Sequence, residues 1–90
     1  DYPVYFMKKL KVLLKDDKII SKIFEDITNK YSDLSPNTDD GVIIDFEEGW
    51  VHMRKSNTEP IVRIFSESKD QEKADNLANK IQKEIVSLSN

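Results

Sequence analysis

Five consecutive residues in the second half of the chain carry a high density of groups that can donate hydrogen bonds to an anion. Arg54, Lys55, Ser56, Asn57 and Thr58 supply a guanidinium, an ammonium, two hydroxyls and a carboxamide. A phosphate dianion offers several acceptor oxygens, so its binding site needs many donors on a short arc. The segment therefore indicates a phosphate-binding loop.

The residues around these donors suit such a loop. Arg54 at a strand end can give a planar, paired N–H contact. Asn57 tolerates left-handed backbone geometry, which turns successive backbone N–H groups inward as an anion nest. Pro60 keeps Glu59 extended, and Glu59 is expected to brace the loop by accepting N–H bonds. The same composition also suits an ordinary hairpin turn with no ligand. On these residues alone the hairpin interpretation is favoured, because short motifs match by chance.

Two helices are predicted from capping residues and apolar spacing. Asp16-Asp17 and Asp70 are typical helix starts, because carboxylates cap free N–H groups and favour the positive end of the helix dipole. Apolar residues then recur at helical spacing. They are Ile19, Ile20, Ile23, Phe24, Ile27 and Tyr31 in the first helix, and Ala74, Leu77, Ala78, Ile81, Ile85 and Leu88 in the second.

Strands are predicted for residues 9–14, 42–47, 50–54 and 61–67, with a loop over 32–41. Pro3 would confine anything before it to a sheet edge or a linker. Glu48-Gly49 is predicted as a tight turn in which Gly49 takes a positive φ. The resulting order is strand–helix–strand–strand–strand–helix. We expect an α+β fold, with an antiparallel sheet of about four strands and two helices on one face.

Size and composition limit the class of protein. Ninety residues, 38% hydrophobic and 34% charged, make a single globular domain over 1–90. Because the chain begins Asp1-Tyr2-Pro3 without an initiator methionine, we expect it to be cut from a longer protein, although processing could also produce such an end. No apolar run approaches the roughly 18–20 residues of a membrane span, and the first residues show no signal-peptide pattern. The absence of cysteine suits a reducing compartment, and we expect a cytoplasmic protein.

Two kinds of site are disfavoured. The net charge of −3 argues against nucleic-acid binding through the basic cluster of Lys8, Lys9, Lys11 and Lys15. His52 is the only histidine, so a histidine-anchored metal site is not expected. A surface position or a satisfied strand position is the better interpretation of His52.

The loop, Arg54 to Pro60, resembles the phosphate-binding loop of the α-D-phosphohexomutases, which include phosphoglucomutase, phosphomannomutase and phosphoglucosamine mutase. Gly41-Val42, Asp45-Phe46, Gly49-Trp50 and Arg63 continue the likeness to their C-terminal domain in register. Tyr2-Pro3 with Tyr5 and the lysine-rich strand look like the beginning of that domain, and the last helix fits as well. The resemblance spans nearly the whole chain, although only the loop is specific.

The resemblance implies that Arg54, Ser56, Asn57 and Thr58 contact a substrate phosphate. Arg63 matches a family arginine on the next strand, where it either adds charge to the site or braces the loop. The alternative for Arg63, a cross-strand ion pair on the polar face of the sheet, stays equally open. Lys55 is expected to be a solvated neighbour.

The resemblance also implies a role. In that family the C-terminal domain holds the phosphate that is not transferred, while a phosphoserine elsewhere donates to the sugar and the domain closes the cleft. The phosphoserine, Mg²⁺ and sugar-recognition loops have no counterpart here. We therefore expect no catalytic residue, metal or cofactor in this chain, with Mg²⁺ held by the absent domains. The full-length protein would be an isomerase (an intramolecular phosphotransferase) of carbohydrate metabolism, and the isolated fragment would be inactive.

The expected partners are a hexose phosphate or bisphosphate and the other domains of the same polypeptide, with no nucleic acid and no membrane. Asn57 departs from the Ser-Gly-Thr form common in phosphoglucosamine mutases and looks closer to the phosphomannomutase/phosphoglucomutase enzymes. The alternative function is a stand-alone α+β interaction module without a phosphate site, which would use an exposed sheet face or edge.

Overall fold

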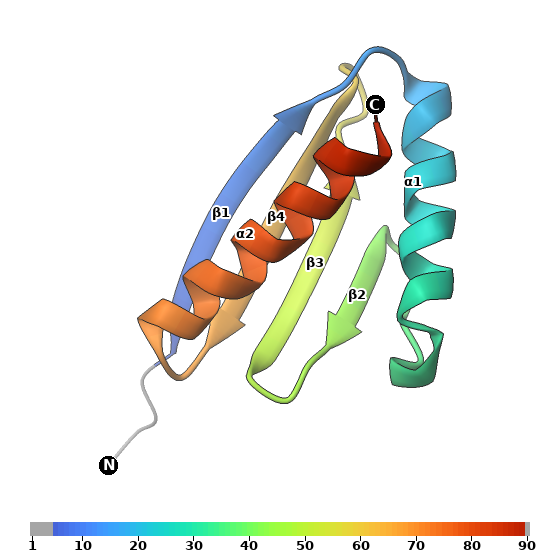
Figure 1. Ribbon diagram of the computed structural model, residues 1–90. Helices are drawn as coiled ribbons and strands as arrows, with labels where there is room; N and C mark the ends of the chain where they lie inside the picture. Colours follow the sequence, from blue (N-terminus) through green and yellow to red (C-terminus); the bar gives the residue numbers. More distant parts are fainter. Residues whose placement is uncertain (1–4, 90) are drawn as a thin grey trace.

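A computed structural model describes residues 5–89 of the protein, and Tyr2 and Pro3 of the expected domain start lie outside them. Figure 1 shows how the elements are arranged. In chain order they are β1 (Phe6–Leu13), α1 (Asp17–Lys30), the short 3₁₀ helix η1 (Ser32–Leu34), β2 (Val42–Asp45), β3 (Gly49–Lys55), β4 (Ile61–Ser68) and α2 (Gln71–Leu88). The predicted α+β fold and its element order are confirmed.

The four strands form one antiparallel sheet in the spatial order β1-β4-β3-β2. The last strand in the sequence therefore lies between the first strand and β3. The connection from β1 to β2 passes from one edge of the sheet to the other and carries α1 with it (Figure 1). Because β1 pairs antiparallel with β4 and Leu13 lies opposite Ile61, the β3–β4 loop and the β1–α1 connection lie at the same end of the molecule.

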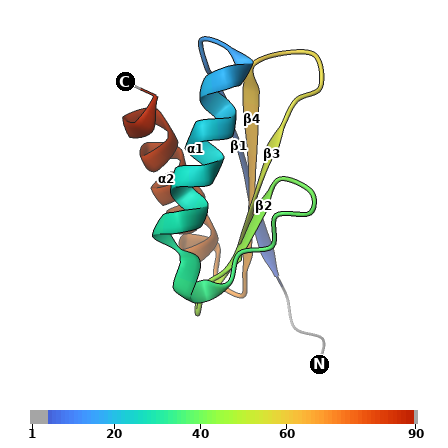
Figure 2. The same ribbon diagram turned by 90° about the vertical axis from the view of Figure 1, so that its right-hand side faces the viewer.

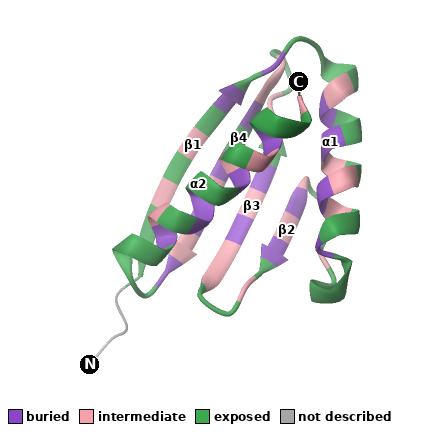
Figure 3. Cartoon of the chain, in the orientation of Figure 1, coloured by how far each residue is buried: buried purple, intermediate pink, exposed green. Residues whose placement is uncertain are grey.

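Both helices cover the same face of the sheet, and the other face carries no helix (Figure 2). The burial colours follow this division, with buried residues on the inner sides of helices and strands (Figure 3). Apolar residues from every strand and both helices form one core, because a helix and a sheet must each bury one apolar face. Its most deeply buried members include Ile20, Ile23, Ile27, Ile44, Val51, Met53, Val62, Ile64, Ile81 and Ile85.

Both helices begin where the acidic residues predicted. The Asp16 carboxylate accepts a hydrogen bond from the backbone N–H of Ile19 at 3.1 Å. Asp70 does the same for the N–H of Glu72 at 2.9 Å. Each bond satisfies one of the free donors at a helix start. The predicted apolar stripe of α2 is buried as far as Ile85, whereas Leu88 at its end is 40% exposed.

The first strand is longer than predicted, since it starts at Phe6 instead of at residue 9. The sequence around Phe6 and Met7 keeps no clear alternation, so the local pattern could not reveal this extension. Pairing with β4 explains it, because Phe6 is the register partner of Ser68 at the far end of that strand. The predicted loop 32–41 also contains a turn of 3₁₀ helix and a bridge between Asn37 and Ile43.

The prediction that Gly49 takes a positive φ is wrong. The glycine with positive φ is Gly41, at +73°. Gly49 is instead the first residue of β3, and a Cβ there would collide with the backbone oxygen of Glu67. Glycine is thus needed at position 49 for a close backbone approach, and at position 41 for left-handed geometry. Within residues 5–89, no helix is long and apolar enough to cross a membrane.

Candidate anion-binding site

The predicted loop joins the two central strands of the sheet and is closed by backbone hydrogen bonds. The N–H of Ser56 donates to the carbonyl of Ile61 at 2.9 Å, and the N–H of Ile61 donates to Glu59 at 2.8 Å. Inside the loop, the backbone N–H of Thr58 lies 3.5 Å from the Ser56 hydroxyl oxygen. The N–H of Leu14 donates to the carbonyl of Pro60 at 2.8 Å and holds the exit of the loop.

Most of the predicted site residues surround one hollow of about 240 Å³ at this end of the sheet. Arg54, Ser56, Asn57 and Arg63 line it together with Lys55 and Phe65. Thr58, the remaining predicted contact, does not line the hollow and is exposed at the tip of the loop. The hollow therefore combines two guanidinium groups with hydroxyl and amide donors, a set that suits an oxyanion.

Three cations lie side by side on the helix-free face of the sheet. Arg63 of β4 is the register partner of Arg54 on β3 and of Lys11 on β1. Their chain neighbours Val12, Met53 and Val62 are buried in the core, so strand alternation directs the three cations to the opposite face. We call Lys11, Arg63 and Arg54 the cation row.

The cation row is only partly neutralised. One Nη2 of Arg54 lies 3.6 Å from a carboxylate oxygen of Asp40, and both side chains are exposed. Among residues 5–89, Arg63 and Lys11 make no ion pair. The cross-strand ion pair considered for Arg63 is therefore absent from the described part of the chain. Arg63 instead has another arginine as its register partner.

His52 anchors the backbone of Asp40, the residue whose carboxylate faces Arg54. The Nε2 atom of His52 lies 2.7 Å from the carbonyl oxygen of Asp40. Because a carbonyl oxygen only accepts, this contact places a proton on Nε2. His52 is thus a hydrogen-bonded strand residue, as the sequence favoured. Among the described residues, no cluster of three or more potential ligands could hold a metal ion.

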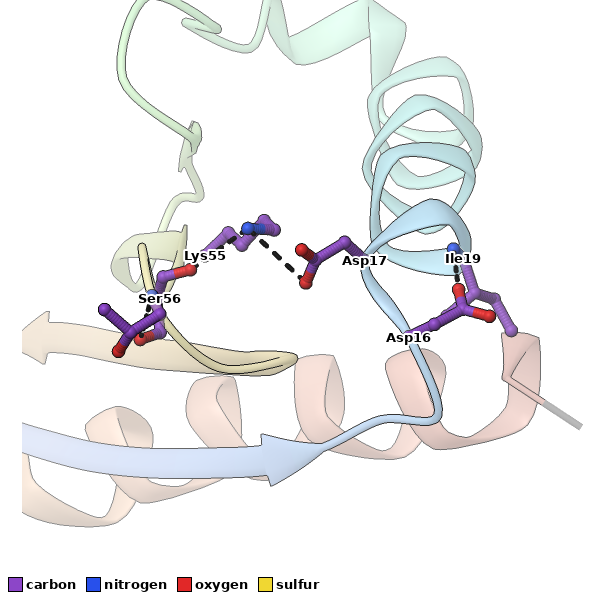
Figure 4. Close-up of polar contacts among 6 residues, drawn as sticks. Asp16, Asp17, Ile19, Lys55 and Ser56 are labelled. Carbon is purple, nitrogen blue, oxygen red and sulfur yellow. Dashed lines mark hydrogen bonds and ion pairs between the residues drawn. The ribbon is translucent and has the colours of Figure 1, made fainter.

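Lys55 differs from the expectation that it is solvated. Its ammonium donates to the carbonyl oxygen of Ser56 at 3.1 Å and lies 3.5 Å from a carboxylate oxygen of Asp17. Its side chain is 32% exposed. Figure 4 shows Lys55 between the loop and the first turn of α1. The sequence contained no local signal for this pair, because Asp17 and Lys55 lie far apart in the chain.

Comparison with known proteins identifies a family and several relatives of this chain. The family described as "Phosphoglucomutase/phosphomannomutase, C-terminal domain" matches residues 7–84. A phosphoglucosamine/phosphogalactosamine mutase of Sulfurisphaera tokodaii is 42% identical over 83 residues, which cover 90% of this chain and 18% of that protein. A phosphoglucomutase/phosphomannomutase of Thermococcus kodakarensis is 42% identical over 76 residues, which cover 82% of this chain and 16% of that protein.

These relatives carry different sugar names, and the chain spans less than a fifth of their length. The match covers most of α2 and all of the sheet except Phe6, with the loop and both arginines inside it. The resemblance noted in the sequence is confirmed. This chain belongs to the family of phosphoglucomutase/phosphomannomutase C-terminal domains.

Proposed function

We propose that this chain is the domain of a phosphosugar mutase that holds the non-transferred phosphate of a hexose phosphate or bisphosphate. The observation that carries the proposal is the cation row. Like charges directly opposite one another in a sheet destabilise it. In a chain whose net charge is −3, three adjacent cations beside a donor-rich loop are best explained by an anion that binds there.

The donors have complementary tasks. Arg54 presents a planar fork that matches two phosphate oxygens, and Arg63 adds the second full charge from the next strand. Ser56 accepts from the N–H of Thr58, which leaves its own O–H free to donate to the ligand. Asn57 lines the same hollow with its carboxamide. Thr58 at the loop tip would reach a phosphate only from the solvent side.

This donor set would recognise a phosphate and ignore the sugar ring. A mutase must bind its sugar in two orientations, because first one and then the other phosphate is transferred. Charged forks and hydroxyls accept a phosphate from either orientation, since they make no demand on the ring. Closure of the domain over the cleft would also exclude water from the phosphorylated enzyme.

The reacting groups would lie in other parts of the full-length protein. The phosphoserine and Mg²⁺ that the family resemblance implies are assigned to those parts, and the isolated chain would not catalyse. The other domains of the same polypeptide are then its partners, and the cytoplasm its location. The full-length enzyme would be an isomerase, acting as an intramolecular phosphotransferase.

The direct test uses a full-length mutase that carries this domain. Arg54→Ala and Ser56→Ala should each raise KM or lower kcat. The loss should reach about tenfold or more for Arg54, because hydrogen bonds to charged groups are worth about 1.5–3 kcal/mol. Lys18→Ala, which removes a cation from the exposed side of α1, should leave both constants unchanged. Wild-type kinetics in the Arg54 variant would refute the assignment. Tight, phosphate-independent binding of an unrelated protein would instead favour the interaction-module alternative.

A further inference from the structure

The β1–α1 connection and the first residue of α1 contact the β3–β4 loop near its two ends. At the loop exit, the N–H of Leu14 donates to the carbonyl oxygen of Pro60 at 2.8 Å. At the loop entrance, the carboxylate of Asp17 lies 3.5 Å from the ammonium of Lys55. A segment distant in the sequence thus braces the loop from the side of the sheet that carries the helices.

Lys55 lies between this brace and the loop. Its ammonium donates to the carbonyl oxygen of Ser56, the first loop residue, at 3.1 Å. Because successive strand residues point to opposite faces, Lys55 leaves β3 on the side opposite Arg54. Although Lys55 also lines the hollow, its ammonium is directed to Asp17 and to the Ser56 carbonyl (Figure 4).

The partner of Lys55 is held in place by the helix start. Asp16 caps α1 through the N–H of Ile19 at 3.1 Å, and Asp17 is the first residue of the helix. A carboxylate in the first helical turn is stabilised by the positive end of the helix dipole. One and two turns further on, Ile20 and Ile23 are fully buried in the core. Asp17 thus offers Lys55 a fixed anchor on a packed helix.

We propose that Lys55 is a positioning residue that clamps the phosphate-binding loop to the first turn of α1 through Asp17. This inference rests on the proposed function, since it assigns Lys55 to the same site without placing it against the ligand. Fixing the Ser56 carbonyl fixes the backbone that presents the Ser56 hydroxyl and the N–H groups after it. A loop ordered in advance loses less conformational entropy when its ligand binds.

The size of the effect follows from the exposure of the pair. The side chains of Lys55 and Asp17 are 32% and 63% exposed, so the pair is a partly screened surface contact. Such pairs contribute about 0.2–1 kcal/mol, which corresponds to an affinity change of up to about fivefold. The expected loss is therefore modest and far smaller than the loss for Arg54.

The experiment compares five variants of this chain: Lys55→Met, Asp17→Asn, the double variant, Lys55→Arg and Lys18→Met. Lys18 is exposed on the same helical turn as Asp17 and makes no ion pair among the described residues, so it controls for charge alone. Inorganic phosphate is titrated in, and its affinity is measured from amide chemical shifts. Amide order parameters of residues 56–59 are measured without phosphate, and melting temperatures confirm folding.

Lys55→Met and Asp17→Asn should each lower the order parameters and weaken phosphate binding, by up to about fivefold. The double variant should be no weaker than either single variant, because both remove the same contact. Lys55→Arg should restore both readouts, and Lys18→Met should change neither.

Unchanged order parameters in Lys55→Met would overturn the clamp. A looser loop with unchanged phosphate affinity would overturn the positioning role, as would losses that simply add in the double variant. Absence of phosphate binding by the wild-type chain would refute the proposed function and, with it, the positioning role. Lowered order parameters would in that case still establish the contact as a structural clamp, so the two failures are distinguishable.

Discussion

Arg54 and Arg63 lie directly opposite each other on the two central strands of the sheet. Residues in this relationship have Cβ atoms about 4.5–5.5 Å apart, close enough for like charges to repel. Lys11 continues the row on the other side of Arg63. The arrangement destabilises the folded state and creates a positive electrostatic potential beside the loop. Stability and anion binding are therefore opposed at this site.

Arg63→Gln should raise the free energy of unfolding, because Arg63 has a cation on each side and opposed like charges destabilise a sheet. The gain should be at most about 1 kcal/mol, the size of interactions between exposed charges. The same change should weaken phosphate binding. Urea denaturation and a phosphate titration measure the two effects. Lys9→Gln is the matched control, since Lys9 lies on the same face of the sheet but opposite Phe65. A less stable Arg63→Gln variant, or one that binds phosphate as well as the wild type, would contradict the account.

Asp40→Asn should strengthen phosphate binding, by up to about fivefold. The carboxylate of Asp40 lies 3.6 Å from the Arg54 guanidinium and competes with an incoming anion. Asparagine keeps the backbone carbonyl that accepts from His52, so the loop should stay in place. Calorimetric titration would compare it with Asp39→Asn, which alters an exposed neighbour without an ion pair among the described residues. Weaker binding in Asp40→Asn would show that Asp40 supports the site.

The capping residues and most of the strands were predictable because they depend on local pattern. Asp16 and Asp70 begin the helices where charge and apolar spacing placed them. The register of Lys11 with Arg63 was not predictable, since it requires β4 to insert between β1 and β3. The Lys55–Asp17 contact depends on the same long-range arrangement. The site residues themselves came mainly from family resemblance, because composition alone favoured a plain hairpin.

Gly41→Ala should destabilise the fold by about 1–3 kcal/mol, because alanine at φ +73° is strained and its Cβ would collide with the Met53 carbonyl oxygen. Since Gly41 lies next to Asp40, loosening there should also disturb the Arg54 contact. Chemical denaturation provides the measurement, and Asn79→Ala on the exposed side of α2 should change stability little. Equal stabilities of the Gly41 variant and the wild type would argue against the backbone geometry described for this loop.

The contact between Tyr31 at the end of α1 and Glu84 of α2 should make the free energy of unfolding fall at high pH. Burial, together with the hydrogen bond and charge of Glu84, raises the pKa of Tyr31 well above its ordinary value of 10.0. The hydroxyl donates to Glu84 at 2.6 Å. A raised folded-state pKa means that the stabilisation is fully present below about pH 10 and is lost as pH rises above it.

Tyr31→Phe removes this group and supplies the matched comparison. The variant should be less stable near neutral pH, by about 1.5–3 kcal/mol, because a hydrogen bond to a charged group is lost. The Glu84 carboxylate keeps the Lys30 ammonium at 2.7 Å as its other donor. Its stability should then fall less steeply than that of the wild type above pH 10. Urea denaturation at a series of pH values provides the curves. If the free energy of unfolding falls equally steeply above pH 10 in both proteins, Tyr31 does not cause the loss of stability at high pH.

The central claim, that this loop holds a sugar phosphate, is tested most directly by an NMR titration of the isotope-labelled chain with glucose 1-phosphate. The account predicts saturable shifts that centre on Arg54, Ser56, Asn57 and Arg63, and that disappear in Arg54→Gln. The same titration with glucose should leave the spectrum unchanged. Shifts that are absent, that centre elsewhere on the sheet, or that persist in the Arg54 variant would contradict it.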